Sequence, residues 1–138
     1  MERIIKILFF CILLSFFCLV HAEEVVSPIS LVTPQKIDYS MCNKIYDLPA
    51  ENLFYLAVAS ANANRFVVEE MQTKTGYLLF SAAGKQYLAS VIKIDATHTQ
   101  LKITPTNNNY YFAPGIVLNF FKYIDLNLNN TITKIKKT

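Results

Sequence analysis

The sequence has few of the side chains on which most enzymes depend for catalysis. The whole chain contains two histidines and three cysteines. His21, Cys11 and Cys18 belong to a leading apolar segment, so only Cys42 and His98 remain beyond it. They are the one nucleophile and base that the rest of the chain could combine, and neither lies in a local motif. No zinc-ligand spacing and no Asp-rich calcium loop is present. We therefore expect no enzyme, no metal and no cofactor.

A single remaining cysteine also excludes a disulfide within the chain. Three roles stay open for Cys42: a buried structural thiol, a bridge to another molecule, or a nucleophile. The fold must then depend on its hydrophobic core. The roughly 116 residues that follow the leading segment suffice for one domain with such a core.

Charge of either sign is scarce as well. The chain has 13 Lys and Arg residues and 10 Asp and Glu residues, and without the leading segment the net charge is about +2. A protein that binds nucleic acid normally has a marked basic face, whereas the one basic cluster here is Lys134, Lys136 and Lys137. We expect no nucleic-acid partner. The basic tail, residues 130–138, is either a solvated end or a weak contact with an anionic membrane or an acidic partner.

The Gly84-Lys85 pair between two apolar runs does not form a phosphate-binding loop. Such a loop needs a glycine five positions earlier, a Ser or Thr after the lysine, and a helix that follows. Leu79 and Gln86 occupy those two positions, and a strand pattern follows. We expect Gly84 to adopt positive φ in a hairpin loop, with Lys85 solvated beside it.

Residues 1–22 have the layout of a secretory signal peptide. A short charged start precedes an apolar run of about 14 residues, which is shorter than the roughly 20 residues of a membrane span. Small residues at Val20 and Ala22 predict cleavage between Ala22 and Glu23. The alternative is an uncleaved anchor. A lipoprotein signal is not expected, because the two cysteines of the run each follow Phe-Phe. The sequence thus predicts export to a periplasm or secretion.

Residues 23–46 lack a sustained period and contain Pro28 and Pro34, so we interpret them as an extended lead-in. One short edge strand is possible around Ile29 to Thr33. The folded domain is expected over residues 47–129. It begins with a helix of about 15 residues, in which Pro49 suits the first turn. The helix has apolar positions three and four residues apart, at Leu53, Leu56, Ala57 and Ala61.

Four short segments rich in aromatic and β-branched residues follow, at residues 66–71, 77–81, 86–95 and 100–104. Their short connections suit hairpins and predict an antiparallel meander. Leu101 and Ile103 share one face of the last strand, which predicts one wet face, whereas the third strand has apolar residues on both faces. Glu69 and Glu70 are neighbours in a strand and are expected on opposite faces.

A second helix is expected from Pro114, with a stripe at Ile116, Val117, Phe120, Phe121, Ile124 and Leu128. The predicted fold class is therefore α+β. We expect an antiparallel sheet of about four strands with two helices packed on one face, in the order α-β-β-β-β-α.

Three aromatic residues, Tyr110, Tyr111 and Phe112, stand directly before the second helix. They form a possible binding surface for an apolar or sugar-like ligand. The alternative is an aromatic staple that fixes the helix to the sheet.

From Leu48 to about Leu128, the layout of helix, antiparallel strands and helix resembles the helix-grip modules of small bacterial envelope proteins. These include accessory lipoproteins of outer-membrane protein assembly. The local similarities are LPAEN and the turn at Gly76-Tyr77, within RFVVEEMQTKTGYLLF. The resemblance implies a non-enzymatic adaptor. Membrane tethering does not carry over, since the lipobox is missing, and no site residues are transferred.

Together these features predict a non-enzymatic binding or accessory module of the cell envelope. Its partner would be an envelope protein or a ligand, bound through the open face of the sheet or the aromatic segment at 110–112. One alternative is a carrier of a small apolar ligand, which would use the cleft between the closing helix and the sheet. Another is a cysteine-dependent enzyme, which requires Cys42 and His98 to be neighbours.

Overall fold

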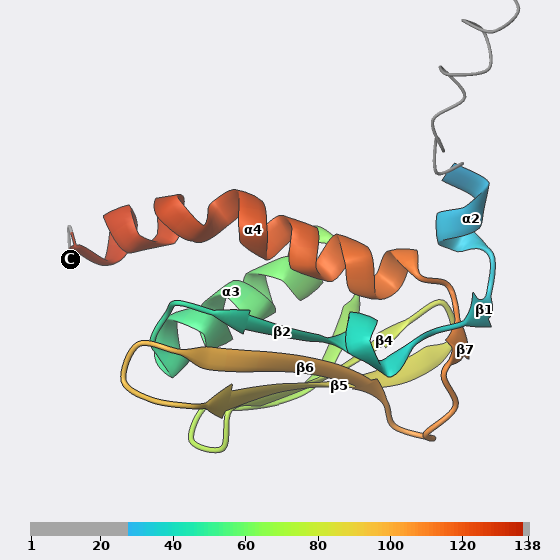
Figure 1. Cartoon of the computed structure of the whole chain (residues 1–138), viewed down its shortest axis with the longest axis horizontal. Coiled ribbons are helices and arrows are strands. Elements are labelled where there is room, and N and C mark those ends of the chain that lie inside the picture. Colours follow the sequence, from blue (N-terminus) through green and yellow to red (C-terminus); the bar gives the residue numbers. More distant parts are fainter. Residues whose placement is uncertain (1–27, 137–138) are drawn as a thin grey trace, which may run out of the picture.

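The computed structural model describes residues 28–136 of the chain, with side chains for residues 30–129 (Figure 1). The predicted signal peptide and its cleavage point after Ala22 lie outside the described residues. In the basic tail, the side chains of Lys134, Lys136 and Lys137 are not described. The fold that follows is that of residues 28–136.

The main sheet is antiparallel and has five strands in the spatial order β2-β6-β5-β4-β3 (Figure 1). The strands are β2 (Asn43–Tyr46), β3 (Val67–Gln72), β4 (Tyr77–Ala82), β5 (Lys85–Lys93) and β6 (Thr99–Pro105). Consecutive strands from β3 to β6 pair with each other. A separate two-stranded sheet joins β1 (Gln35–Lys36) to β7 (Tyr111–Phe112). The α+β class is therefore confirmed.

Two helices, α3 (Ala50–Ala63) and α4 (Gly115–Lys136), lie on the same side of the main sheet (Figure 1). Both follow a proline, Pro49 and Pro114, as the sequence predicts. Two shorter helical segments precede them, α2 (Pro28–Val32) and the 3-10 turn η1 (Tyr39–Cys42).

Aromatic rings fill the space between the helices and the sheet. Phe80 of β4 is fully buried, and its ring stacks on those of Phe66, Tyr87 and Phe120, with centroids 5.3 to 5.4 Å apart. The buried Ser60 hydroxyl of α3 donates a hydrogen bond to the Phe120 carbonyl of α4 at 2.7 Å. This bond joins the two helices, so α3, α4 and the sheet share one core.

The predicted sheet of about four strands, with its element order, is only roughly matched. The main sheet has a fifth strand, because β2 pairs with β6 from Asn43↔Lys102 to Tyr46↔Thr99 and lies before the expected start at Asp47. The order is thus β-α-β-β-β-β-α. Four residues with a lysine among them have no clear alternation of apolar and polar side chains. Their strand depends on a partner more than 50 residues away in sequence, which a local pattern does not show.

The segment expected as an edge strand around Ile29 to Thr33 is instead the helical turn α2. Pro28 suits a first helical turn, and α2 packs on the start of α4. A Cβ atom at Gly115 would lie 2.7 Å from the Leu31 carbonyl oxygen. Glycine therefore permits this close approach.

Candidate functional site

The face of the main sheet opposite α3 and α4 is not covered by any other described element, and we call it the open face. The strand register aligns its side chains in rows across β2, β6, β5 and β4. The rows are Ile45, Gln100 and Ile92, then Asn43, Lys102, Ser90 and Tyr77, then Thr104, Leu88 and Leu79. Ile45 is 58% exposed and Ile92 is 41% exposed. The open face thus mixes aliphatic and polar side chains, and β6 contributes only polar ones.

A β-bulge places two carboxylates together on the open face, contrary to the prediction that Glu69 and Glu70 point in opposite directions. The register of β3 against β4 shifts between Val68 and Glu70. Glu69 accepts hydrogen bonds from Ser81 Oγ and Gln86 Nε2, and Glu70 accepts one from the Tyr77 hydroxyl at 2.7 Å. An extra residue in one strand breaks the two-residue period. The extra residue is evident only from the pairing with β4, so no local pattern in the sequence predicts it.

Two of these hydrogen bonds favour the charged form of Glu69. The donors Ser81 and Gln86 lower the pKa of Glu69. The hydrogen bond to Glu70 raises the pKa of Tyr77. The β3 side of the open face therefore carries negative charge at neutral pH.

A cation lies on the opposite side of the same face. Lys102 of β6 places its Nζ atom 5.4 Å from the centroid of the Tyr39 ring, which belongs to η1. A hydrogen bond with Tyr39 raises the pKa of Lys102. The open face is thus polarised, with carboxylates at β3 and an ammonium group at β6.

The aromatic segment expected to bind a ligand is divided between the surface and the core. Phe112 is 3% exposed, and its ring meets that of Tyr87 edge-on at 5.2 Å. Tyr110 is half-buried and packs edge-on against Tyr39 at 6.0 Å. Tyr111 alone is largely accessible, at 59%. Phe112 therefore fixes the entry to α4, as a staple would, and Tyr111 is available for contact.

The structure gives the turn at Gly84 the predicted conformation and gives Lys85 a different role. Gly84 has φ +75°, as expected for the hairpin loop. Lys85 is not simply solvated, because its Nζ atom donates hydrogen bonds to the carbonyl oxygens of Asn109 and Tyr111 and lies 5.5 Å from the Phe112 ring. It anchors the aromatic segment to β5.

Cys42 and His98 are not neighbours. Cys42 directly precedes Asn43, which pairs with Lys102, whereas His98 directly precedes Thr99, which pairs with Tyr46. They therefore lie at opposite ends of β2, roughly 10 Å or more apart at about 3.3 Å per residue. Burial, and then the nearby Asp38, raise the pKa of the fully buried Cys42 thiol to about 11. Cys42 and His98 therefore do not form the pair that the hypothesis of a cysteine-dependent enzyme requires.

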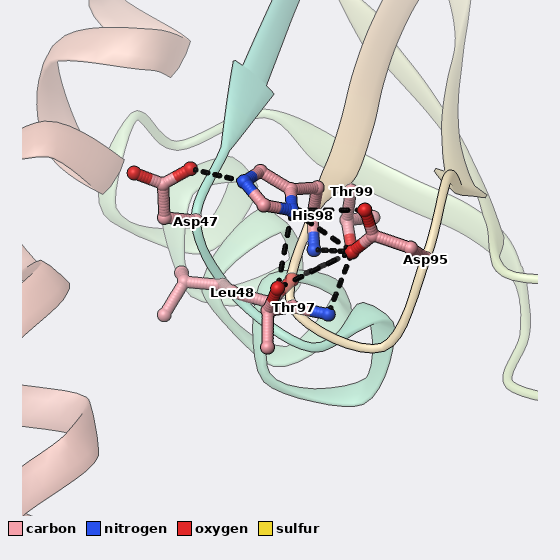
Figure 2. A network of polar contacts seen from close by, with 6 residues as sticks. All are labelled: Asp47, Leu48, Asp95, Thr97, His98 and Thr99. Atoms are coloured by element: carbon pink, nitrogen blue, oxygen red, sulfur yellow. Dashed lines mark hydrogen bonds and ion pairs between the residues drawn. The ribbon is translucent and has the colours of Figure 1, made fainter.

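His98 instead bridges two carboxylates at the end of the main sheet (Figure 2). Its Nε2 lies 3.2 Å from Asp47 Oδ1, in the connection between β2 and α3. Its Nδ1 lies 2.9 Å from Asp95 Oδ1, in the turn between β5 and β6. The hydrogen bond and charge of Asp95, with Asp47, raise the pKa of His98. Hydrogen bonds from Thr97 and His98 lower the pKa of Asp95 to about 2. We call this arrangement the His98 clamp.

Beneath the clamp, a buried hydrogen bond ties the same two connections together. Thr99 is fully buried, and its Oγ1 donates to the Leu48 carbonyl oxygen at 2.7 Å (Figure 2). Because each His98 nitrogen faces a different carboxylate, the three groups do not converge on one point. The arrangement suits a structural connection.

The space between α4 and the main sheet is filled. Val117, Phe120 and Ile124 of α4 are fully buried. Two clefts, of about 410 and 390 Å³, lie between α4 and η1 and between α4 and β2, at the edge of the main sheet. A filled interior does not favour the apolar-ligand carrier.

Within residues 28–136, no helix is both long and apolar enough to span a membrane. In the same part of the chain, no three His, Cys, Asp or Glu side chains are grouped so that they could hold a metal ion. The chain matches no protein-family model, and no curated protein is significantly similar to it.

Proposed function

We propose that this chain is a non-enzymatic accessory module of the cell envelope, exported by its N-terminal segment, that binds a partner protein through the open face of its main sheet. The observation that supports this proposal most is the contrast between the two faces. Two helices pack on one face, and the other presents aliphatic side chains in register. The resemblance to helix-grip modules, which stays a prediction, fits the same role.

The chemistry of the open face suits a protein surface better than a small molecule. Its aliphatic residues, among them Ile45 and Ile92, are spread over a broad sheet, and Ile45 borders the cleft of about 390 Å³ between β2 and α4. The carboxylates at β3 and Lys102 at β6 add charges of opposite sign at separate places. Complementary charges of this kind orient a partner and exclude wrong ones.

We include Tyr111 of the two-stranded sheet in the proposed binding surface. It is 59% exposed, and tyrosine supplies a large contact area at low conformational cost. The neighbouring Phe112 and Tyr110 hold the backbone at Tyr111 in place, because their rings pack on Tyr87 and Tyr39. We assign the direct contact to Tyr111 and a supporting role to the other two.

The experiment is affinity capture from envelope fractions of the cells that produce the protein. A double variant, Ile45→Lys with Ile92→Lys, places two charges on the open face. The double variant should retain roughly tenfold less, or even less, of the partner than the unmodified chain does, because both ammonium groups would be desolvated in the complex.

The matched control is Val32→Lys with Leu126→Lys, which adds the same charges at two exposed positions away from the open face, 73% and 70% exposed. The control should retain the partner at the level of the unmodified chain. If no protein is specifically retained, or if the two double variants lose it equally, the proposal is wrong.

A further inference from the structure

A cleft of about 510 Å³ opens on the helix-covered side of the molecule, away from the open face. Three segments line it: the first two turns of α3, the turn between β3 and β4, and the end of β5. It lies beside α3 and not along α4, where the carrier hypothesis expected a site. Its volume falls within the range of small-molecule sites.

The floor and one wall of this cleft are apolar. Phe54 and Val91 form the floor and are nearly buried, at 5% and 8% exposed. Tyr55 stands beside them, 52% exposed, with its ring edge-on to that of Phe54 at 6.1 Å. A flat apolar group could therefore contact three side chains at once.

The opposite wall is held in place by the backbone. The Val91 amide donates a hydrogen bond to the Gly76 carbonyl oxygen at 2.7 Å. Gly76 has φ +70°, and a Cβ atom there would lie 3.0 Å from the Val91 carbonyl oxygen. Glycine thus allows the turn to rest against β5, so the cleft is already formed before a ligand arrives.

The charges at the cleft are unequal. Lys74 of the turn and Lys93 of β5 line it, together with Glu51 of α3. Neither lysine has a hydrogen bond or ion pair with any side chain or backbone group in the described part of the chain. The lining therefore has one uncompensated positive charge next to an apolar floor.

We infer that this cleft binds a small amphipathic anion, with an aliphatic or aromatic body on Phe54, Tyr55 and Val91 and an acidic head group that Lys74 and Lys93 attract. Glu51 opposes the head group. The inference is independent of the proposed function, since the open face and the cleft share no residue.

The experiment titrates the full chain with 8-anilinonaphthalene-1-sulfonate, an aromatic anion whose fluorescence rises in apolar surroundings. Dodecanoate serves as a competitor, and dodecylammonium as its cationic counterpart. At low salt, Lys74→Gln and Lys93→Gln should each raise the dissociation constant roughly two- to fivefold, and Glu51→Gln should lower it by a similar factor. Dodecanoate should displace the probe better than dodecylammonium.

Lys122→Gln is the matched control, because it removes the same charge from an exposed position on α4. It should leave the dissociation constant unchanged, and melting curves should show that all four variants are folded. If Lys122→Gln weakens binding as much as the cleft variants, or if Glu51→Gln also weakens it, no anion site exists in the cleft. Failure here leaves the capture experiment on the open face unaffected.

Discussion

The two faces of the main sheet are made from alternate residues of the same strands and have opposite properties. On the helix-covered face, Leu78, Phe80, Tyr87, Ala89, Leu101 and Ile103 are all within 1% of full burial. On the open face, their immediate neighbours are half-buried or exposed and mix aliphatic, hydroxyl, amide and charged groups. The covered face stabilises the fold. The open face contributes no fully buried side chain to that core.

The largest expected effect compares Leu78 and Leu79, which are adjacent in β4 and point to opposite faces. Leu78→Ala should lower the free energy of unfolding by about 2 to 5 kcal/mol, because it leaves a cavity in the core. Leu79→Ala should cost roughly 1 kcal/mol, since its side chain is only half-buried. Urea denaturation measures both. Equal losses would contradict the division into two faces.

Thiol chemistry sharpens the same comparison. Burial raises the pKa of Cys42 to about 11, so the native thiol should react with a disulfide reagent at pH 8 roughly 100-fold or more slowly than an exposed thiol. The exposed reference is Ile92→Cys in a Cys42→Ser background. The rates should become equal in denaturant. Rapid reaction of native Cys42 would show that the core is open.

A buried polar contact tests the end of the covered face. Thr99→Val keeps the shape of the side chain and leaves the Leu48 carbonyl oxygen without its hydrogen bond from Thr99 Oγ1. The free energy of unfolding should fall by about 1 to 2 kcal/mol. Thr104→Val, on the open face of the same strand, is the control and should change stability little. If Thr99→Val left the free energy of unfolding unchanged, the hydrogen bond would contribute nothing to stability.

The smallest expected effect concerns the exposed His98 clamp, and its sign depends on pH. Because the pKa of His98 is raised in the folded state, its contribution is fully present below the unfolded pKa, near 6.5, and disappears as pH rises through the folded pKa. His98→Asn should therefore lower the melting temperature at pH 5.5 and leave it almost unchanged at pH 9. An equal loss at both values would contradict a charged clamp.

Local sequence patterns predict the buried face of β6, the apolar stripe of the closing helix and one hairpin turn correctly. The burial of Leu101 and Ile103, the stripe on α4 from Ile116 to Ile124 and the hairpin at Gly84 are confirmed. In β5 the pattern was ambiguous, because Leu88 and Ile92 make its open face apolar as well. Which face of β5 is buried depends on where the two helices pack, and the sequence of the strand alone does not show this.

The features that were missed depend on partners distant in the sequence. The strand β2 exists through its pairing with β6, and the Glu69–Glu70 bulge exists through its mismatch with β4. The His98 clamp joins Asp47 and Asp95, which are close only after both connections are in place. None of these features produces a local apolar periodicity, so the sequence pattern does not predict them.

Site-specific photocrosslinking in the producing cells tests the role of the open face most directly. A benzophenone side chain at position 92 lies on the open face, and the same side chain at position 126 lies on the exposed side of α4. We predict a discrete adduct with one envelope protein from position 92 and none from position 126. Adducts from position 126 alone, or none from position 92 although the protein is folded and exported, would contradict the proposal that the open face binds a partner.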